Sequence, residues 1–269
     1  MNFSIIVFIL GNILKVEGIL LVFPMIVSLI YREEPKNIFS FLIVIITLLV
    51  LGTICTAKKP KKMGMQAKDR FIIVSLSWII LSFFGALPFV ISGEIPSLID
   101  AFFETSSGFT TTGSSILSSV EDLSHSMLFW RSFTHLIGGM GVLVFALAIL
   151  PAAGLESVHV MKAEVPGPVF GKLVAKMRIT ARILYGIYLV MTAILIVLLM
   201  IGGMSLFDAT LHAFGAAGTG GFGIKNSSAP WRLCLSGSRR LMAGPPRSRF
   251  IHAAPPPEGR RLRDRKSVV

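Results

Sequence analysis

Charged residues are scarce in this chain of 269 residues, because Asp, Glu, Lys and Arg make up 15% of it and a soluble domain carries roughly 25%. Hydrophobic residues make up 53% and gather in long runs. A helix needs roughly 20 apolar residues to cross a bilayer, and most of the runs reach that length: 3–30, 38–57, 71–92, 127–150 and 183–203. A soluble domain is therefore excluded, and a helical protein that crosses the membrane several times is predicted. The first run lacks the basic start and the A-x-A site of a cleavable signal peptide.

Cysteines and catalytic motifs are also few or absent. Cys55 and Cys234 are too few and too far apart in sequence for a disulfide framework or a metal motif. The five histidines show no H-E-x-x-H or Cys/His ligand spacing. No G-x-S-x-G nucleophile elbow is present, and the glycines of HLIGGMG lack the G-x-G-x-x-G spacing of a dinucleotide site. We therefore expect no enzyme, no organic cofactor and no resident metal.

Positive charge is unevenly distributed, which argues against a nucleic-acid partner. Of the net charge of +12, +8 lies in residues 230–269 and +4 in the rest. In that remainder, Lys and Arg crowd the connections at 58–70 and 162–182 and are absent from 92–127 and 203–224. By the positive-inside rule the two basic connections are cytoplasmic and the two others face outward.

The two outward segments repeat each other 108 residues apart without a gap. Each copy opens with S-x-x-D, a helix-start signature, and closes in a Thr/Gly run that is too polar for lipid. Chance Thr/Gly clusters do not recur in register with matching flanks. Six pairs of residues are identical: Ser97/Ser205, Leu98/Leu206, Asp100/Asp208, Ala101/Ala209, Thr111/Thr219 and Gly113/Gly221.

A short helix that ends in a Thr/Gly loop between two spans has the chemistry of a cation pore. The helix is too short to cross the membrane, so the negative end of its dipole points into the membrane centre. The TTTG and TGGF runs that follow supply backbone carbonyls, and Thr hydroxyls, that replace the hydration shell of a cation. Glycine allows the backbone angles that such a wall requires. Asp100 and Asp208, at the outer ends of the helices, raise the local cation concentration.

Side chains near these segments carry further expectations. Gly138, Gly139 and Gly141 favour close helix packing. Arg131 and His135, one helical turn apart near the outer end of this helix, favour a structural role, either holding the filter loop or reaching the interface, over proton chemistry. Lys15 and Glu17 do not face each other on a helix, so we expect them to snorkel or to face the helix bundle. Two of the three tryptophans are expected to anchor at the membrane interfaces: Trp78 and Trp130.

Four stretches resemble the Trk-type potassium uptake subunits, TrkH and TrkG, and more distantly KtrB: DAFFETSSGFTTTGSSIL, FWRSFTHLIGGMGVLVFALAILP, MKAEVPGPVFGKLVAKMRITAR and LFDATLHAFGAAGTGGFG. The resemblance covers about residues 1–228. It implies an all-α polytopic membrane protein in which two leader transmembrane helices precede four potassium-channel-like helix–pore loop–helix repeats. It places the potassium filter on Thr111, Thr112 and Gly113 in the first repeat and on Thr219, Gly220 and Gly221 in the second.

The same resemblance implies the ion, the location and the partners. K⁺ is the bound and transported ion, and the protein lies in the bacterial inner (plasma) membrane in contact with lipid. A homodimer is expected, with a cytosolic TrkA-like regulatory subunit that binds NAD or ATP. Gly220 stands where a classical potassium filter has a valine-like residue, which fits the less stringent selectivity of the family.

The chain holds about one and a half of the four implied repeats. Its expected parts are a leader helix pair at 1–69, a first repeat at 70–150, a cytoplasmic loop at 151–177, an incomplete second repeat at 178–228 and a tail at 229–269. Four repeats and the leader need about 500 residues, so the third-repeat gating loop and the fourth-repeat helix are missing. The Arg/Pro-rich tail has the composition of a disordered segment. We expect a frameshift or a chimeric end rather than a basic regulatory tail.

Two other functions stay open. The same loops serve a secondary cation symporter, coupled to Na⁺ or H⁺, if they bind the driving ion in alternation with K⁺. The truncated chain is alternatively a non-conducting membrane fragment.

Overall fold

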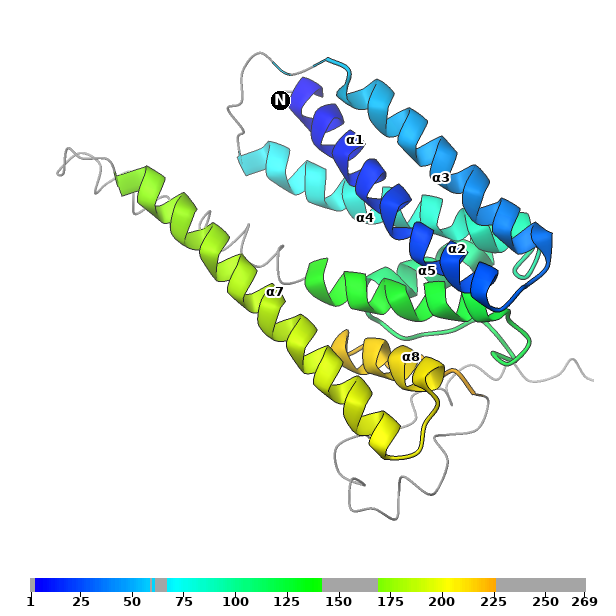
Figure 1. The fold of residues 1–269 in the computed structure, drawn as a ribbon. Coiled ribbons are helices and arrows are strands. Elements are labelled where there is room, and N and C mark those ends of the chain that lie inside the picture. The colour runs from blue at the N-terminus through cyan, green and yellow to red at the C-terminus, as the bar shows by residue number, and fades with distance from the viewer. Residues whose placement is uncertain (1–2, 59, 61–66, 142–168, 226–269) are drawn as a thin grey trace, which may run out of the picture.

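The computed structural model describes residues 3–58, 60, 67–141 and 169–225, and every regular element in this part of the chain is a helix (Figure 1). The expected all-α architecture is confirmed. The expected tail at 229–269 and most of the expected cytoplasmic loop lie outside the described residues. Four helical stretches are long and apolar enough to cross a membrane: Phe3–Ile30, Pro35–Thr56, Lys68–Ser92 and Thr180–Ile201. The expected span at 127–150 is described only as far as residue 141.

The first expected leader helix consists of two helices, α1 (Phe3–Leu20) and α2 (Val22–Ile30). The break at Leu21 precedes Pro24, which has no N–H to donate to the carbonyl of Leu20 and whose ring crowds it. The chain then turns back into α3 (Pro35–Thr56), which begins with proline at its first position. Figure 1 shows α1 and α3 side by side.

Glycines bring the backbones of α1 and α3 together. A Cβ atom on Gly11 would lie 2.6 Å from the Cβ of Cys55, and one on Gly52 would lie 2.8 Å from the carbonyl oxygen of Gly11. Lipid tails are as apolar as leucine, so membrane helices associate through such close packing rather than through the hydrophobic effect. Lys15 contributes a bond from its Nζ to Thr56 Oγ1 at 2.5 Å.

The first repeat comprises α4 (Ala67–Ser92), the short helix α5 (Leu98–Phe109) and a helix at 125–141. The second repeat contributes α7 (Val169–Ile201) and the short helix α8 (Leu206–Ala217). α7 begins at Val169, so the last part of the expected cytoplasmic loop is helical and the helix starts earlier than the expected boundary at 178.

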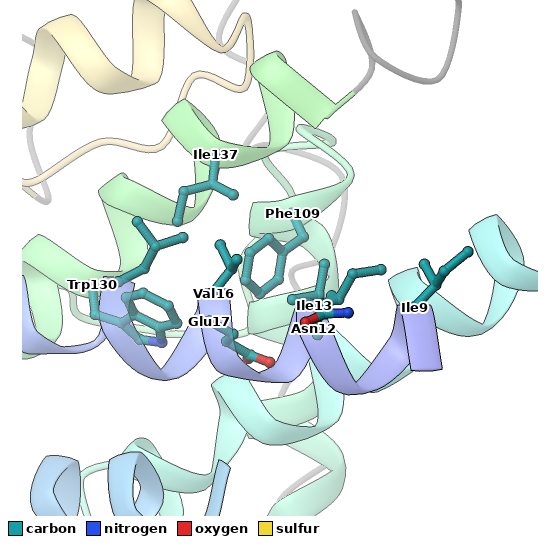
Figure 2. Close-up of a pocket in the computed structure, with 10 residues that line it drawn as sticks. Ile9, Asn12, Ile13, Val16, Glu17, Phe109, Trp130 and Ile137 are labelled. Atoms are coloured by element: carbon teal, nitrogen blue, oxygen red, sulfur yellow. The ribbon is translucent and has the colours of Figure 1, made fainter. Parts of the chain in front are cut away.

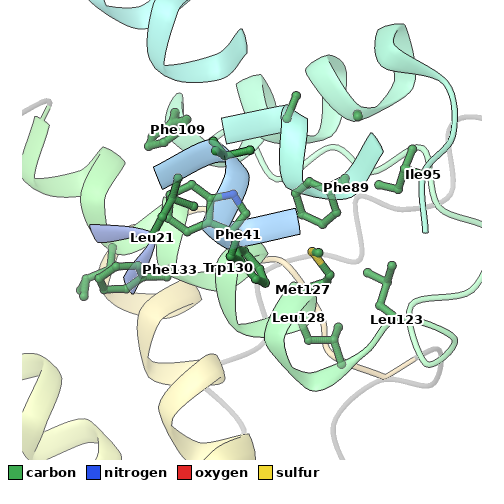
Figure 3. Close-up of a cluster of buried hydrophobic side chains, with 14 of the residues drawn as sticks. Leu21, Phe41, Phe89, Ile95, Phe109, Leu123, Met127, Leu128, Trp130 and Phe133 are labelled. Atoms are coloured by element: carbon green, nitrogen blue, oxygen red, sulfur yellow. The ribbon is translucent and has the colours of Figure 1, made fainter. Parts of the chain in front are cut away.

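One apolar core joins the leader helices to both repeats. Figure 3 shows Leu21, Phe41, Phe109 and Trp130 gathered in it, and Leu211 and Phe214 of α8 belong to the same cluster. The interface position expected for Trp130 is wrong, because its side chain is fully buried and its Nε1 donates to the carbonyl of Gly85 at 2.8 Å. Because the indole N–H already has a hydrogen-bond partner inside the protein, it does not require the polar membrane interface to satisfy it.

Contacts between connections place the ends of several helices on one side. Glu33, after α2, accepts a bond from the amide of Ser126 at 3.0 Å. Glu94, after α4, accepts one from the amide of Ser124 at 3.1 Å. Tyr31 packs edge-on against Phe207 at the start of α8. The turn between α2 and α3 therefore lies beside the outer ends of both repeats, which agrees with the orientation predicted from loop charge.

Candidate ion-conduction site

The two short helices α5 and α8 begin in the same way. The amide of Asp100 donates to Ser97 Oγ at 3.4 Å, and the amide of Asp208 donates to Ser205 Oγ at 3.1 Å. Each serine is the N-cap residue of its helix. The S-x-x-D signature thus starts a helix in both copies, through a side chain that satisfies an unpaired amide.

The two helices also end in the same way. The amide of Thr112 donates to the carbonyl of Ser107 at 2.9 Å, and the equivalent amide of Gly220 donates to the carbonyl of Gly215 at 3.0 Å. These bonds span six residues and form a Schellman-type C-terminus, in which the penultimate residue takes the left-handed conformation. That residue is usually glycine, but here it is Thr111 with φ +54° and Thr219 with φ +57°. A β-branched residue at positive φ is an outlier that costs about 1–2 kcal/mol.

The strained threonines are the first residues of a backbone pattern that both loops share. Thr111 and Gly113 have positive φ, with +73° at Gly113, whereas Thr112 between them does not. Thr219 and Gly221, with +79° at Gly221, enclose Gly220 in the same way. Alternating backbone handedness turns successive peptide groups to one side, rather than to opposite sides as in a strand. The six residues predicted for the filter thus form two loops of one conformation, which we call loop 1 (111–113) and loop 2 (219–221).

Loops 1 and 2 touch through their backbones. A Cβ atom on Gly113 would lie 1.8 Å from the carbonyl oxygen of Gly220, far inside contact distance. A Cβ on Gly221 would meet nothing within 4 Å. Gly113 is therefore required both by its φ and by its neighbour, whereas Gly221 is required by its φ alone.

The glycines of the 125–141 helix pack closely against neighbouring backbone, as predicted. A Cβ on Gly138 would lie 2.1 Å from the carbonyl oxygen of Phe109, at the end of α5. A Cβ on Gly139 would lie 3.0 Å from the Cα of Gly218, at the end of α8. The close packing expected of these glycines is confirmed, and it brings one helix against the ends of both short helices.

A buried ion pair lies beside both loops. The Nε atom of Arg131, in the 125–141 helix, lies 2.5 Å from Oε1 of Glu104 in α5, and the two side chains are 2% and 0% exposed. Arg131 was expected either to hold the filter loop or to reach the interface, and its partner Glu104 was not identified from the sequence. The sequence did contain a signal for this pair. Glu104 is a carboxylate among apolar residues on a short membrane helix, and a charge buried in the membrane requires a partner.

His135, one turn after Arg131, packs against loop 2. Its ring stacks on Phe222 with centroids 4.0 Å apart and lies so near Gly220 that a Cβ there would be 2.4 Å from it. Neither ring nitrogen bonds to another described residue. The expected structural role of His135 agrees with this position.

The two aspartates at the outer ends of the short helices differ in their surroundings. Lys225, which follows loop 2, places its Nζ 3.4 Å from Oδ2 of Asp208. This exposed pair partly neutralises the negative charge of Asp208. Asp100 therefore remains the stronger candidate for attracting cations to the pore mouth.

An apolar cavity of about 350 Å³ lies between α1 and the first repeat (Figure 2). Ile9 and Ile13 line it from α1, and Phe109 and Trp130 line it from the repeat. Glu17 borders it, but its carboxylate is buried and bonds to no other described residue. Glu17 faces the helix bundle, as one of its two expected placements has it, and most of the side chains that line the cavity are apolar.

The fold and the paired loops define a multi-pass membrane protein of potassium-channel-like architecture. The structure superposes on the crystal structure of the potassium transporter TrkH from Vibrio parahaemolyticus with a TM-score of 0.74 and 32% identity, covering 87% of this chain and 48% of that one.

Sequence comparison agrees with this likeness. Residues 35–231 match the TrkH family, described as cation transport proteins. The chain is 36% identical over 231 residues to the Trk system potassium uptake protein TrkH of Vibrio parahaemolyticus, covering 85% of this chain and 47% of that protein. It is 36% identical over 207 residues to TrkG of Escherichia coli K12, covering 76% of this chain and 42% of that protein.

The chain belongs to the TrkH family of cation transport proteins. It spans about half the length of the curated relatives that it matches. The resemblance in the four sequence stretches is thus confirmed at the level of the family.

Proposed function

We propose that this chain supplies two walls of a potassium uptake pore in the inner membrane, and that loops 1 and 2 are the potassium-binding parts of those walls. The observation that carries the proposal is the shared backbone pattern of the loops together with their contact at Gly113 and Gly220. Two walls of one conformation that meet edge to edge are what a ring of repeated filter segments requires. The name of the relatives, potassium uptake proteins, supports the choice of ion.

Each part of the site has a role in this proposal. Backbone carbonyls of the loops replace the hydration shell of K⁺, and the Thr hydroxyls add ligands. The C-terminal ends of α5 and α8 direct their negative dipole ends toward the loops. An inside-negative potential then draws K⁺ inward with roughly 2.3 kcal/mol per charge for each 100 mV.

The test uses the full chain, produced in potassium-uptake-deficient cells together with the second half of Vibrio parahaemolyticus TrkH as a separate polypeptide. We call this combination the reconstituted pair. It is expected to take up K⁺ in preference to Na⁺, and Gly113→Ser or Gly221→Ser is expected to lower that preference at least tenfold. Isotope flux in membrane vesicles measures both ions. Unchanged selectivity in both variants would overturn the assignment of the loops.

The two competing functions give different fluxes in the same assay. A symporter coupled to Na⁺ or H⁺ stops when the gradient of the second ion is removed, whereas a potential-driven pore continues. A non-conducting fragment gives no K⁺ flux even when the second half is present, whereas the proposed pair of pore walls conducts in the reconstituted pair. We propose the pore because the two loops share one backbone pattern and lie in contact at Gly113 and Gly220.

The partners proposed from the resemblance are membrane lipid, a second copy of the protein and a cytosolic TrkA-like subunit that binds NAD or ATP. The exposed apolar faces of α3 and α7 suit lipid or further helices. Copurification of the reconstituted pair with a tagged second copy, and with a TrkA-like protein, tests the other two partners.

A further inference from the structure

The Glu104–Arg131 ion pair is connected by hydrogen bonds to the segments that directly follow loop 1 and loop 2. The carboxylate of Glu104 accepts bonds from Ser115 Oγ at 3.0 Å and from the amide of Ile116 at 3.0 Å. Both donors lie shortly after loop 1. Glu104 therefore holds the outer end of loop 1 from the side of α5.

Arg131 holds the outer end of loop 2. Its Nη1 donates to the carbonyl of Gly223 at 2.9 Å, and its guanidinium lies 3.6 Å from the ring centre of Phe222. Phe222 and Gly223 directly follow loop 2. The planar guanidinium thus bonds to Glu104 through one nitrogen and to loop 2 through another, which a lysine ammonium cannot reproduce in the same geometry.

The pair is not repeated at the equivalent position of the second repeat. His212 stands 108 residues after Glu104, and its Nδ1 lies 2.9 Å from the carbonyl of Asp208 in its own helix. The bond to the carbonyl of Gly223 therefore comes from Arg131 of the first repeat, and the described part of α8 holds no equivalent of Glu104. The single pair reaches both loops because Gly113 and Gly220 already bring them into contact.

Stability alone does not explain a buried ion pair. Removing two charges from water is costly, and replacing both partners by apolar residues of similar volume is often neutral or stabilising. What apolar residues cannot supply are the bonds to Ser115, Ile116 and Gly223. These bonds fix where the two loops lie relative to each other.

We propose that Glu104 and Arg131 are positioning residues that set the spacing of loops 1 and 2 for K⁺ without touching the ion. This inference rests on the proposed potassium pore. It predicts that loss of the pair changes ion preference and the KM for K⁺ while the protein still folds.

The decisive variant is Glu104→Leu combined with Arg131→Met in the reconstituted pair. It is expected to reach the membrane in normal amounts, to lose at least tenfold in K⁺ over Na⁺ preference and to raise the KM for K⁺. Ser132→Ala, a neighbouring buried change on the same helix, is the matched control and is expected to leave both values unchanged. The double variant with parental selectivity and KM overturns the proposal.

Two milder variants keep the test decisive if the double variant does not fold. Arg131→Lys keeps the charge but gives up one of the two bonds, and Ser115→Ala removes one donor to Glu104 on an exposed loop. Each is expected to lower selectivity about three- to tenfold, and parental selectivity in both overturns the proposal. A parent that transports K⁺ and Na⁺ alike instead contradicts the proposed function, so the two failures are distinguishable.

Discussion

Thr111 and Thr219 take a left-handed conformation that glycine adopts at little cost. Each ends a helix in a motif where glycine is the usual residue, yet each keeps its β-branched side chain. Such strain persists only where the surrounding structure over-determines it, and it clusters at functional sites. The threonine side chains at equivalent positions of both loops are therefore an argument for function at the scale of the residue.

Gly113 and Gly221 differ in why glycine is required. Both have positive φ, but only Gly113 lies against the backbone of another described residue. Gly113→Ala places a methyl group against the carbonyl of Gly220, whereas a Cβ on Gly221 meets no described residue of this chain within 4 Å and bears the strain of positive φ. We expect Gly113→Ala to abolish selective K⁺ flux in the reconstituted pair and Gly221→Ala to reduce it several-fold. Gly186→Ala, where a Cβ also meets nothing within 4 Å, is the control and leaves flux unchanged. Parental K⁺ flux in Gly113→Ala would argue against the backbone contact between the loops.

At the scale of the element, small residues decide how the helices pack. The α1–α3 pair meets at Gly11 and Gly52, and the 125–141 helix meets the ends of α5 and α8 at Gly138 and Gly139. Close backbone approach increases dispersion contact, which drives association where water is absent. The leader helices and the pore loops thus depend on the same packing rule.

Substitution at the α1–α3 contact tests this rule. Gly52→Leu forces a side chain into the backbone of Gly11, and such overpacking costs about 1–3 kcal/mol. We expect a lower melting temperature of the detergent-solubilised full chain, measured by thermal aggregation. Gly186→Leu on α7, which meets open space, should melt like the parent. If both variants melt alike, the glycine contact does not stabilise the helix pair.

At the scale of the whole molecule, loop charge and the tertiary contacts between turns indicate the same orientation in the membrane. The basic connection that ends near Lys68 is assigned to the cytoplasm, and the segment around Ser118 to the outside. Glu33 and Glu94 bond to the amides that begin the 125–141 helix, so the outer turns form one contiguous layer. A reversed orientation would place the loops and this layer in the cytoplasm.

Cysteine labelling checks the orientation in intact cells. In a background with Cys55→Ser and Cys234→Ser, Ser118→Cys is expected to react with a membrane-impermeant maleimide. Lys68→Cys should react only after the membrane is permeabilised. Both side chains are exposed in the structure, so access within the protein does not limit the reaction. Labelling of Lys68→Cys in intact cells would contradict the predicted topology.

The sequence alone determined the membrane class and both short helices, and it predicted the orientation and the six loop residues, because run length, loop charge and the S-x-x-D and Thr/Gly patterns are local properties. It did not reveal Glu104 as the partner of Arg131, nor the burial of Trp130, nor the contact between Gly113 and Gly220. Arg131 meets residues 27 and 92 positions away. Only the tertiary structure decides which distant groups meet, since a buried charge or indole N–H demands a partner but its own sequence neighbourhood does not name one.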